Sequence, residues 1–550
     1  MMRGLMQDYP LTIDRLLRRA EDYFGHKTIV SVEPRREVTT TYREWAHGTR
    51  KLAGAFDLLG TARDARIGSF AWNSGRHLQM YFGVPSAGRV LHCINIRLSP
   101  AQITFVINHA EDEVIFVDRS LLPTLGPLLP QCPTVRHLVV MNDDPSVEYD
   151  LKGVAAQVHD YDELIASAPA VEMKVIDENR AAAMCYTSGT TGDPKGVVYS
   201  HRSIYLHSMA ASAIGTLGIN EADAILPLVP MFHANAWGIP HAAIAQGADI
   251  VLPGSDLTGP RVADLLVDHA ITMTAGVPTL WTATLPHLKG RNTSSLRLIA
   301  CGGAAVPVSL SEAYRVEIGL PIQQAWGMTE TSPLAALARL DRSHAELDAE
   351  EQAQLRAGVG RATLGVEARI VEPDSTAPVP HDGKATGELQ VAGPWIAGSY
   401  YQGSENPDGT VGADGFTEDG WLRTGDVATM DDRGWIRLVD RTKDLIKSGG
   451  EWISSVDLEN ELMNHASVRE AAVVGVPHER WTERPIACVV AAPGESIDPD
   501  ELVSHLADKF PKWQLPDQII VVDEIPKTSV GKFSKIQLRT RYRDALHLGE

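Results

Sequence analysis

The sequence predicts an α/β protein with a large N-terminal domain of parallel sheets and helices, a small β-barrel-like subdomain and a small α+β C-terminal domain. Three patterns predict this fold class. Apolar runs alternate with amphipathic stretches over most of the chain, a later region alternates strictly between apolar and polar residues, and the final segment mixes helical and strand patterns. At 550 residues the chain is also too long for one compact core, so two or more domains are expected.

The first pattern predicts a parallel sheet covered by helices. Residues 66–72, 90–96 and 113–118 have the apolar, β-branched character of buried strands, whereas 77–90 and 101–110 have the spacing of helices. The alternation resumes after a glycine-rich stretch, with one predicted helix and then further buried strands. These are the helix at 203–218 and the strands at 223–230, 248–254, 271–278 and 295–303.

The second and third patterns predict the smaller units. Residues 362–438 alternate strictly and are interrupted by Gly, Asp and Pro, which indicates a small antiparallel sheet or barrel. The tail is long enough to be a separate domain. We therefore expect an N-terminal domain at 1–440 and a C-terminal domain at 441–550. In the tail we predict helices at 455–468 and 498–516 and strands at 470–477, 486–494 and 517–526.

Charge and cysteine usage exclude several classes of protein. The net charge of −20 argues against a nucleic-acid binder, although local lysines and backbone amides can still hold small anions. The five cysteines are scattered and match neither a zinc site nor a disulfide framework, which predicts free thiols in a reducing cytoplasm. The first residues lack the apolar core of a signal peptide, and no apolar run is long enough to span a membrane. These observations predict a cytoplasmic protein and leave a peripheral membrane contact open.

The stretch YTSGTTGDPKGV at 186–197 has two interpretations. Glycines let backbone amides converge on an anion, hydroxyl groups donate to phosphate oxygens, and Lys195 adds a mobile positive charge. The spacing is not that of a Walker A loop. Taken alone, such a stretch is more often a surface turn than a phosphate loop.

Three further stretches carry polar residues that would serve a nucleotide. In QAWGMTETSP, Glu330 follows the flat aromatic Trp326 among hydroxyl residues, as a magnesium nucleotide would require. Asp426 is a turn former or a ligand of ribose hydroxyls, with Arg441 following it in the chain. In PKTSVGKFSKIQL the glycine-flanked Lys532 lies near the C terminus, where a lysine is usually solvated. Each of these residues has an ordinary interpretation when it is taken alone.

Together these stretches resemble a known family. YTSGTTGDPKGV, MFHANAWG, QAWGMTETSP, WLRTGD, DRTKDLIKSGGEWIS and PKTSVGKFSK occur in the order and approximate spacing of the adenylate-forming superfamily. The resemblance spans essentially the whole chain. Within the superfamily, HANAW and SGGEWISSVDLE are most similar to bacterial medium- to long-chain fatty acyl-CoA synthetases.

The resemblance implies a two-step reaction that uses ATP, Mg²⁺ and CoA. A medium- to long-chain fatty acid would first attack the α-phosphate of ATP, giving acyl-AMP and pyrophosphate, and CoA would then displace AMP to give acyl-CoA. An acyl-AMP ligase or stand-alone adenylation enzyme that acylates a carrier protein would share every nucleotide motif. A non-catalytic ligand-binding protein is disfavoured, because Lys532, Glu330 and Asp426 are all present.

The resemblance also implies roles for the nucleotide-site residues. The loop would hold the β- and γ-phosphates, and Thr187 and Glu330 would lie near Mg²⁺. Trp326 would form the adenine site where many relatives have Tyr, which keeps the stacking face and loses the phenol. The loop residues are Thr187, Ser188, Gly189, Thr190, Thr191, Gly192 and Lys195. The adenine-side residues are Gly302, Gly303, Ala304, Gln324, Ala325, Trp326, Gly327, Met328 and Thr329.

Further roles concern catalysis and domain movement. Asp426, assisted by Arg441, would bind the ribose hydroxyls. Lys532 would bridge the α-phosphate and the attacking carboxylate, acting as a catalytic residue together with Glu330 and His233. Lys443 would be the hinge about which a mobile C-terminal domain rotates between the two half-reactions. The rotation would bring Gly449, Gly450, Glu451 and Trp452 to the CoA tunnel and the nucleotide, and Lys447 would be a further cofactor-binding residue.

The substrate side is predicted from HANAW and its surroundings. His233 would flank the bound carboxylate, and Trp237 matches the position that gates the acyl tunnel, whereas an aromatic in an apolar segment is otherwise core packing. Val277 and Gly302 complete the expected acyl site. Amino-acid-activating relatives usually carry an Asp shortly after the position of Phe232, and its absence here favours a neutral acyl chain. Relatives of this type often form homodimers through the N-terminal domain, and the resemblance extends that expectation to this chain.

Overall fold

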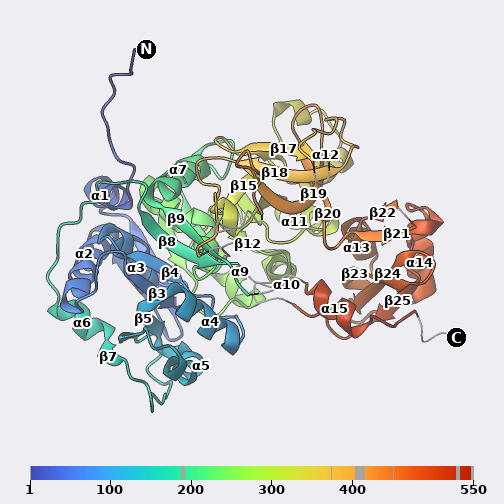
Figure 1. Cartoon of the computed structure of the whole chain (residues 1–550). Helices are drawn as coiled ribbons and strands as arrows, with labels where there is room; N and C mark the ends of the chain where they lie inside the picture. Colours follow the sequence, from blue (N-terminus) through green and yellow to red (C-terminus); the bar gives the residue numbers. More distant parts are fainter. Residues whose placement is uncertain are drawn as a thin grey trace.

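The computed structural model describes residues 2–187, 193–372, 375–402, 415–449, 451–527 and 533–546. Figure 1 shows a large part that contains the N-terminal sheets and a smaller part at the C-terminal end beside it. The strands form four sheets, of which the two largest are built mainly from parallel strands. The predicted α/β class, with a large N-terminal and a smaller C-terminal domain, is therefore confirmed.

The first large sheet has seven strands in the order β7-β6-β5-β3-β4-β8-β9. All neighbours are parallel except β8 and β9. The runs predicted as strands at 66–72, 90–96 and 113–118 become β3, β4 and β5. The strands are β3 (Arg66–Phe70), β4 (Val90–Cys93), β5 (Asp112–Asp118), β6 (His137–Met141), β7 (Gln157–Asp160), β8 (Ala181–Tyr186) and β9 (Gly196–Ser200).

The second large sheet has nine strands in the order β16-β15-β14-β13-β12-β10-β11-β1-β2. Its central strands, from β14 to β1, are parallel, and antiparallel strands flank them on both sides. The four buried strands predicted between 223 and 303 become β10 to β13. The strands are β1 (Thr28–Glu33), β2 (Arg36–Thr41), β10 (Ala224–Pro227), β11 (Asp249–Leu252), β12 (Met273–Gly276), β13 (Leu298–Cys301), β14 (Ile322–Gly327), β15 (Leu334–Leu337) and β16 (Arg361–Ala362).

The helices of the large part begin at clear sequence signals. The Thr41 hydroxyl accepts from the Glu44 amide at the start of α2, and Ser99 and Gln102 form the same reciprocal capping box ahead of α4. Pro100 is the first residue of α4, where its missing amide hydrogen is not needed. The helices are α1 (Ile13–Phe24), α2 (Tyr42–Leu58), α3 (Gly75–Ser86), α4 (Pro100–Ala110), α5 (Leu122–Leu125), α6 (Tyr161–Ser167), α7 (His201–Ser212), α8 (Ile239–Gln246), α9 (Gly259–Asp268), α10 (Pro278–Leu288), α11 (Val308–Ile318) and α12 (Ala349–Ala357).

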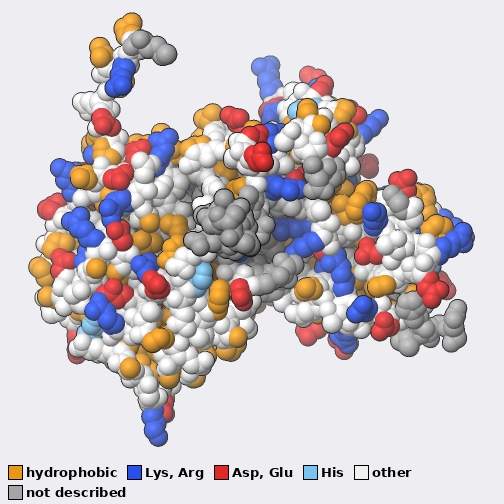
Figure 2. All heavy atoms as spheres, viewed as in Figure 1, with side chains coloured by type: hydrophobic (Ala, Val, Ile, Leu, Met, Phe, Trp, Pro, Cys, Tyr) orange, Lys and Arg blue, Asp and Glu red, His pale blue; other side chains and the backbone are white. Residues whose placement is uncertain are grey.

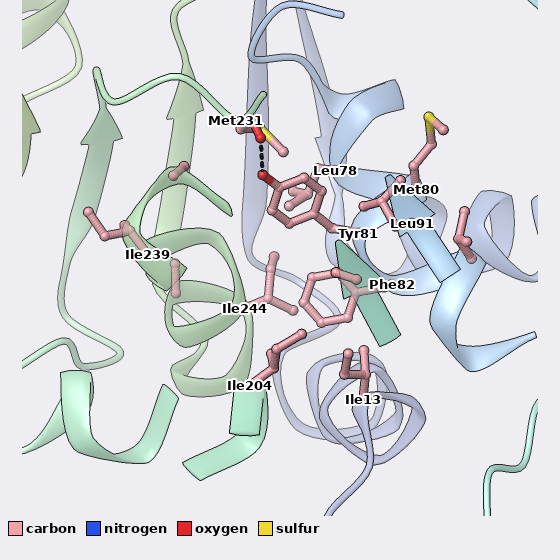
Figure 3. Packing of buried hydrophobic residues seen from close by; sticks show 14 of the residues in the cluster. Ile13, Leu78, Met80, Tyr81, Phe82, Leu91, Ile204, Met231, Ile239 and Ile244 are labelled. Atoms are coloured by element: carbon pink, nitrogen blue, oxygen red, sulfur yellow. Dashed lines mark hydrogen bonds between the residues drawn. The ribbon is translucent and has the colours of Figure 1, made fainter. Parts of the chain in front are cut away.

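The largest hydrophobic core joins the helices and strands of the two large sheets. Figure 3 shows Phe82 of α3 beside Ile244 of α8, with Ile239 of α8 in the same cluster and the Tyr81 hydroxyl donating to the backbone oxygen of Met231. These residues are at most 1% exposed. Because one core holds both sheets, the segment between Met231 and Ile239 is anchored at both of its ends.

The region with strict alternation forms a four-stranded antiparallel sheet in the order β17-β18-β19-β20. The alternation predicts either a small antiparallel sheet or a barrel, and the structure has the antiparallel sheet. Its inner face has its own core around Trp395 and Leu389. The strands are β17 (Glu367–Val371), β18 (Gly387–Ala392), β19 (Leu422–Met430) and β20 (Ile436–Arg441).

The C-terminal part is a five-stranded sheet covered by helices, with two hydrophobic clusters of its own. Since β20 still includes Asp440 and Arg441, and the next strand begins at Ile446, the division between 440 and 441 stays a prediction. No helix within the described ranges has the length and apolar character needed to cross a membrane. The elements are β21 (Ile446–Ser448), β22 (Glu451–Ile453), α13 (Ser455–Asn464), β23 (Val468–His478), β24 (Thr482–Ala491), α14 (Pro499–Ala507), β25 (Gln518–Val521) and α15 (Lys535–Arg541).

Candidate active site

A cavity of about 1160 Å³ lies where the large sheets, the four-stranded sheet and the C-terminal part meet. Much of its wall is formed by residues that directly follow the parallel strands β8, β10, β12, β13 and β14. Ligands in α/β proteins commonly bind outside the carboxyl ends of parallel strands, because the loops that leave neighbouring strands converge there. Residues of β19, β20, α13 and α15 close the remaining sides.

The cavity brings together most of the residues that the sequence predicts for the site. Four predicted residues that the structure describes, Lys447, Gly449, Glu451 and Trp452, do not line it. Seven others, Ser188, Gly189, Thr190, Thr191, Gly192, Gly450 and Lys532, lie outside the described residues. The predicted residues that do line it are Thr187, Lys195, His233, Trp237, Val277, Gly302, Gly303, Ala304, Gln324, Ala325, Trp326, Gly327, Met328, Thr329, Glu330, Asp426, Arg441 and Lys443.

Asp426 is a carboxylate of the cavity that two side chains hold in place. The Trp326 indole nitrogen donates to its Oδ2 at 2.9 Å, and Arg441 Nε lies 2.9 Å from its Oδ1. Asp426 and Arg441 are opposite each other on β19 and β20, and Asp426 raises the pKa of Arg441, so the guanidinium stays charged. A carboxylate offers about four lone-pair directions, so Asp426 can still accept from a ligand hydroxyl.

Glu330 is held by a residue that the sequence analysis missed. The Tyr400 hydroxyl donates to Glu330 Oε1 at 2.7 Å, and the Tyr400 ring lies 4.7 Å from Lys195 Nζ. Burial, together with Glu330, raises the pKa of the Tyr400 phenol, which keeps it protonated as a donor. Tyr400 thus links the loop lysine to the acidic residue. Its local sequence contains no signal for this role, because its partner lies 70 positions earlier.

The acidic residues of the site suit magnesium held partly by a substrate. Within the part of the chain that the structure describes, no three His, Cys, Asp or Glu side chains are grouped so as to hold a metal ion. Magnesium at nucleotide sites usually takes only one or two protein oxygens, and phosphates and water complete its shell. Glu330 and Thr187 both line the cavity and offer such oxygens, so the residues present fit this mode of binding.

The apolar end of the cavity is formed by Trp237 against Gly302. A Cβ atom at Gly302 would lie 3.0 Å from the Trp237 ring and 2.7 Å from the Ala325 carbonyl oxygen, so only glycine allows this contact. Trp237 belongs to a turn, Ala234–Gly238, in which every residue has a positive φ, between 43° and 70°. The sequence analysis did not anticipate this left-handed backbone, because only the last of the five residues is a glycine.

The C-terminal edge of the cavity includes Phe533, Ser534 and Lys535, which follow Lys532 in the chain. Lys535 is buried and lies 2.7 Å from Glu459 Oε1. It also donates to Ser455 Oγ.

Beside Lys535, the Ser455 amide donates to Asp440 Oδ2 at 2.7 Å, so the contact joins the end of β20 to the start of α13. Two carboxylates face one ammonium group there. Burial raises the pKa of Glu459 to about 7 against the opposing effect of Lys535. Burial would lower the pKa of Lys535, but Glu459 and Asp440 raise it, so Lys535 remains charged.

Positive charge gathers at this edge although the chain as a whole carries a net charge of −20. Figure 2 shows Lys and Arg side chains along the junction of the large and small parts. Arg437, Arg441, Lys443 and Arg539 line the cavity, and burial lowers the pKa of Lys443. A local basic edge suits a small anionic ligand in an otherwise acidic protein.

Comparison with known proteins matches this architecture to a family. Residues 17–401 match the family model described as AMP-binding enzyme, and residues 457–532 match the AMP-binding enzyme C-terminal domain. The chain belongs to the AMP-binding enzyme family. The predicted resemblance to the adenylate-forming superfamily is thereby confirmed, and with it the class of AMP-forming acid–thiol ligases, whose members use ATP and CoA.

Several relatives in the family match over almost their whole length. The chain is 43% identical to 3-methylmercaptopropionyl-CoA ligase of Ruegeria lacuscaerulensis, covering 99% of this chain and 100% of the relative. It is 44% identical to a long-chain-fatty-acid–CoA ligase of Thermus thermophilus, over 98% and 97%. It is 40% identical to a medium-chain-fatty-acid–CoA ligase of Ectopseudomonas oleovorans, over 99% and 98%.

Solved structures of the family share the fold. The anthranilate CoA ligase AuaEII in complex with anthranoyl-AMP superposes with a TM-score of 0.84, at 24% identity, over 98% of this chain and 100% of that one. ATP-bound MatB from Rhodopseudomonas palustris gives a TM-score of 0.81, at 24% identity, over 97% and 99%. At this level of identity the likeness concerns the fold of the chain.

Proposed function

We propose that this protein activates a medium- to long-chain fatty acid with ATP and transfers the acyl group to CoA, giving acyl-CoA, AMP and pyrophosphate. The observation that carries the proposal is the single cavity that joins an apolar end to a polar one. Trp237, Val277 and Gly302 offer the apolar surface that an acyl chain requires, and Glu330 and Asp426 lie in the same cavity. A carboxylic acid and a nucleotide can therefore meet within one enclosed space.

At the polar end the side chains fit the parts of ATP. Thr187 and Lys195, with Ser188 to Gly192, would hold the β- and γ-phosphates, and Glu330 and Thr187 would hold Mg²⁺. When bound, the metal ion would neutralise phosphate charge. Trp326 would form the adenine site with its neighbours on β14 and with Gly302 to Ala304. Asp426, already oriented by two donors, would accept the ribose hydroxyls without having to reorganise.

The first half-reaction would form a bond between a carboxylate oxygen of the acid and the α-phosphorus of ATP as the bond to pyrophosphate breaks. His233 would flank the acid, and Lys532 would offset the negative charge that gathers between the two reactants. Supporting this role, residues 533–535 line the cavity next to Lys532 in the chain. The enzyme itself needs no covalent intermediate, since positioning and charge stabilisation suffice.

In the second half-reaction the sulfur of CoA would bond to the acyl carbon, the thiol proton would leave, and AMP would depart with the electron pair. For this step we propose that residues 441–550 rotate about Lys443 relative to residues 1–440. The rotation would bring Lys447, Gly449, Gly450 and Trp452 to the cavity. Trp452 is 50% exposed in the present arrangement and is therefore available for a new contact.

A substrate screen tests the proposal. Purified protein is supplied with ATP, Mg²⁺ and CoA and with straight-chain acids from two to eighteen carbons, and AMP and pyrophosphate are measured. We include 3-methylmercaptopropionate because the name of the Ruegeria relative specifies that acid. We expect acid-dependent AMP release with the highest kcat/KM for a medium- or long-chain acid. No AMP release with any acid would refute the proposal, and acylation of a carrier protein but not of CoA would favour the carrier-protein alternative.

We also propose a cytoplasmic location and a homodimer that forms through the N-terminal domain. All five cysteines are free and buried, which suits a reducing compartment. Light scattering coupled to size-exclusion chromatography tests the assembly, and a mass equal to that of one chain would refute the dimer.

A further inference from the structure

Asn235 occupies the centre of the left-handed turn Ala234–Gly238 but does not line the cavity. Its side chain is buried, and its Oδ1 accepts from two thiols, Cys93 Sγ at 3.5 Å and Cys185 Sγ at 3.3 Å. These cysteines are register partners on β4 and β8 of the seven-stranded sheet. A residue of the loop after β10 is therefore bonded to two strands of a different sheet.

The two thiols are suited to act as donors. Burial raises the pKa of Cys93 well above its usual value, so it carries its proton at neutral pH. A buried amide oxygen that loses its donors is left unsatisfied, which disfavours the conformation that buries it. The pair of thiols thus favours the position of Asn235 seen in the structure.

The backbone of the turn needs such support. Left-handed conformations are unfavourable for residues other than glycine, and Ala234, Ala236 and Trp237 all adopt them next to Asn235. Asparagine tolerates this region better than most residues. Strained backbone of this kind persists only where the surroundings determine it, and such residues cluster at functional sites.

The turn is also confined at its two ends. Figure 3 shows Met231, just before it, bonded through its backbone oxygen to Tyr81, and Ile239, just after it, packed in the same core. A Cβ atom at Gly238 would lie only 2.5 Å from a His207 ring nitrogen, so the backbone has no room on that side. Only the backbone conformation in the middle of the turn is left to be fixed, and there Asn235 is bonded.

We propose that Asn235, bonded to Cys93 and Cys185, is a positioning residue that sets acyl-chain specificity by fixing Trp237 against Gly302. This inference rests on the proposed function, since the acyl chain is the ligand that Trp237 would meet. The side chains act in sequence: the thiols hold Asn235, Asn235 holds the turn, and the turn places the indole at the apolar end of the cavity. Cys93, Cys185 and Asn235 do not line the cavity, so ATP binding should not depend on them.

Substitutions of the two thiols test the proposal without altering the backbone preference of the turn. The double variant Cys93→Ala/Cys185→Ala removes both donors, whereas Cys93→Ser/Cys185→Ser keeps them. For each protein, kcat/KM is measured for a short, a medium and a long acid, with the KM for ATP. We expect the ratio between long and short acids to change at least fivefold in the alanine variant and the KM for ATP to stay within twofold.

The serine variant should restore most of the wild-type ratio, because the hydroxyl also donates. Cys132→Ala is the matched control, since the thiol of this buried cysteine donates to the Leu128 carbonyl oxygen and not to Asn235, and it should leave the ratio unchanged. An unchanged acid ratio in the alanine variant would overturn the proposal.

A double-mutant cycle separates positioning from general packing. Asn235→Ala is made in the wild-type and in the Trp237→Ala protein. If Asn235 acts through Trp237, Asn235→Ala should change the ratio of kcat/KM between long and short acids only in the protein that retains Trp237. An equal shift in both backgrounds would overturn the proposal.

A spectroscopic measurement keeps the proposal testable if a variant loses activity or if the proposed function itself fails. The protein is labelled with 5-fluorotryptophan, and the Trp237 fluorine resonance is assigned with Trp237→Phe. We expect this resonance to shift or broaden in Cys93→Ala/Cys185→Ala and to stay in place in Cys132→Ala. An unmoved resonance would overturn the positioning role, whereas a wild-type protein that forms no thioester from any acid would refute the proposed function instead.

Discussion

The N-terminal walls of the cavity and its C-terminal edge are held in different ways. In the walls, Asp426 and Glu330 are at most 5% exposed and accept from the aromatic side chains of Trp326 and Tyr400 in the same large part. At the C-terminal edge, the contacts run between separate parts of the chain. Arg437 of β20 lies 2.8 Å from Asp457 of α13, and Ser455 of α13 bonds to Asp440 of β20.

This difference indicates how one cavity can serve two reactions. The walls are preorganised, so nucleotide and acid groups should be bound with little rearrangement. The C-terminal edge is joined to them by polar pairs, and Arg437 is 60% exposed at its side chain, where an ion pair contributes little. A change in the position of this edge would break this exposed pair and the Asp440–Ser455 bonds, and it would leave the contacts of Trp326 and Tyr400 in the walls intact.

The strongest test of the C-terminal edge is Lys532→Ala. We expect adenylation to fall by about 10²–10³-fold, because a charge that stabilises the transition state is lost, while thioester formation from supplied acyl-AMP is spared. The two half-reactions are measured separately, by pyrophosphate release and by acyl-CoA formation. Lys527→Ala, in the same segment and paired with Glu470, serves as the control and should retain both activities. Equal losses in the two half-reactions would contradict the assignment of Lys532 to the first.

The two regions should also differ in their response to pH. Burial lowers the pKa of His77, His201 and His241 to about 4 and that of His207 to about 3, all in the large part. These groups bind protons in the unfolded chain below pH 6.5 but not in the folded one, so stability is lost as the pH falls.

From pH 7.5 to 5.5 we expect the free energy of unfolding of the large part to drop by about 5 kcal/mol. Urea unfolding at the two pH values measures this change. Glu459, in the C-terminal part, has the opposite sign, since its pKa of about 7 makes its contribution disappear as the pH rises. Equal stability at both values would show that the buried histidines do not govern the large part.

Within the walls, Asp426→Ala should weaken ATP binding. The substitution leaves the Trp326 indole and the Arg441 guanidinium without their shared acceptor. It also removes the acceptor that we propose for the ribose hydroxyls. We expect the KM for ATP to rise about tenfold, with the acid profile unchanged. Asp426→Asn keeps an acceptor without the charge, so its KM for ATP should lie between those of the wild type and Asp426→Ala. A shift in acid preference instead would place Asp426 on the substrate side.

The smallest effect is expected at the contact between the two regions. Ser455→Ala removes the hydroxyl bond to Asp440 and the bond that the hydroxyl accepts from Lys535, while the backbone amide keeps its own bond to Asp440, so the arrangement seen here should become less favoured relative to others. We expect a two- to threefold change in the ratio of the half-reaction rates, corresponding to roughly 0.5 kcal/mol. Ser504→Ala, which removes only a bond within α14, is the control. A ratio equal to that of the wild type would show that this contact does not bias the arrangement.

Much of the site could be predicted because motifs follow strands. The family resemblance assigned Trp326 and Gly302 to one site, and the fold brings them together because Trp326 lies on β14 and Gly302 directly follows β13, its parallel neighbour. Tyr400 and Asn235 could not be found in this way. Their partners lie on elements far away in the sequence, and the left-handed turn depends on contacts between two sheets rather than on local residue preferences.

The order of the cavity residues along the chain has a consequence for how such enzymes diversify. The residues proposed for the acyl chain, from His233 to Gly302, lie in one continuous stretch, whereas most residues proposed for ATP lie before it, at Thr187 and Lys195, or after it, from Gln324 onward. Recombination or point substitution within that stretch can therefore change the acid that is accepted while leaving the ATP chemistry untouched. A change of substrate range can therefore be confined to one stretch of the chain, which helps such enzymes to evolve and makes the same stretch a suitable target for engineering.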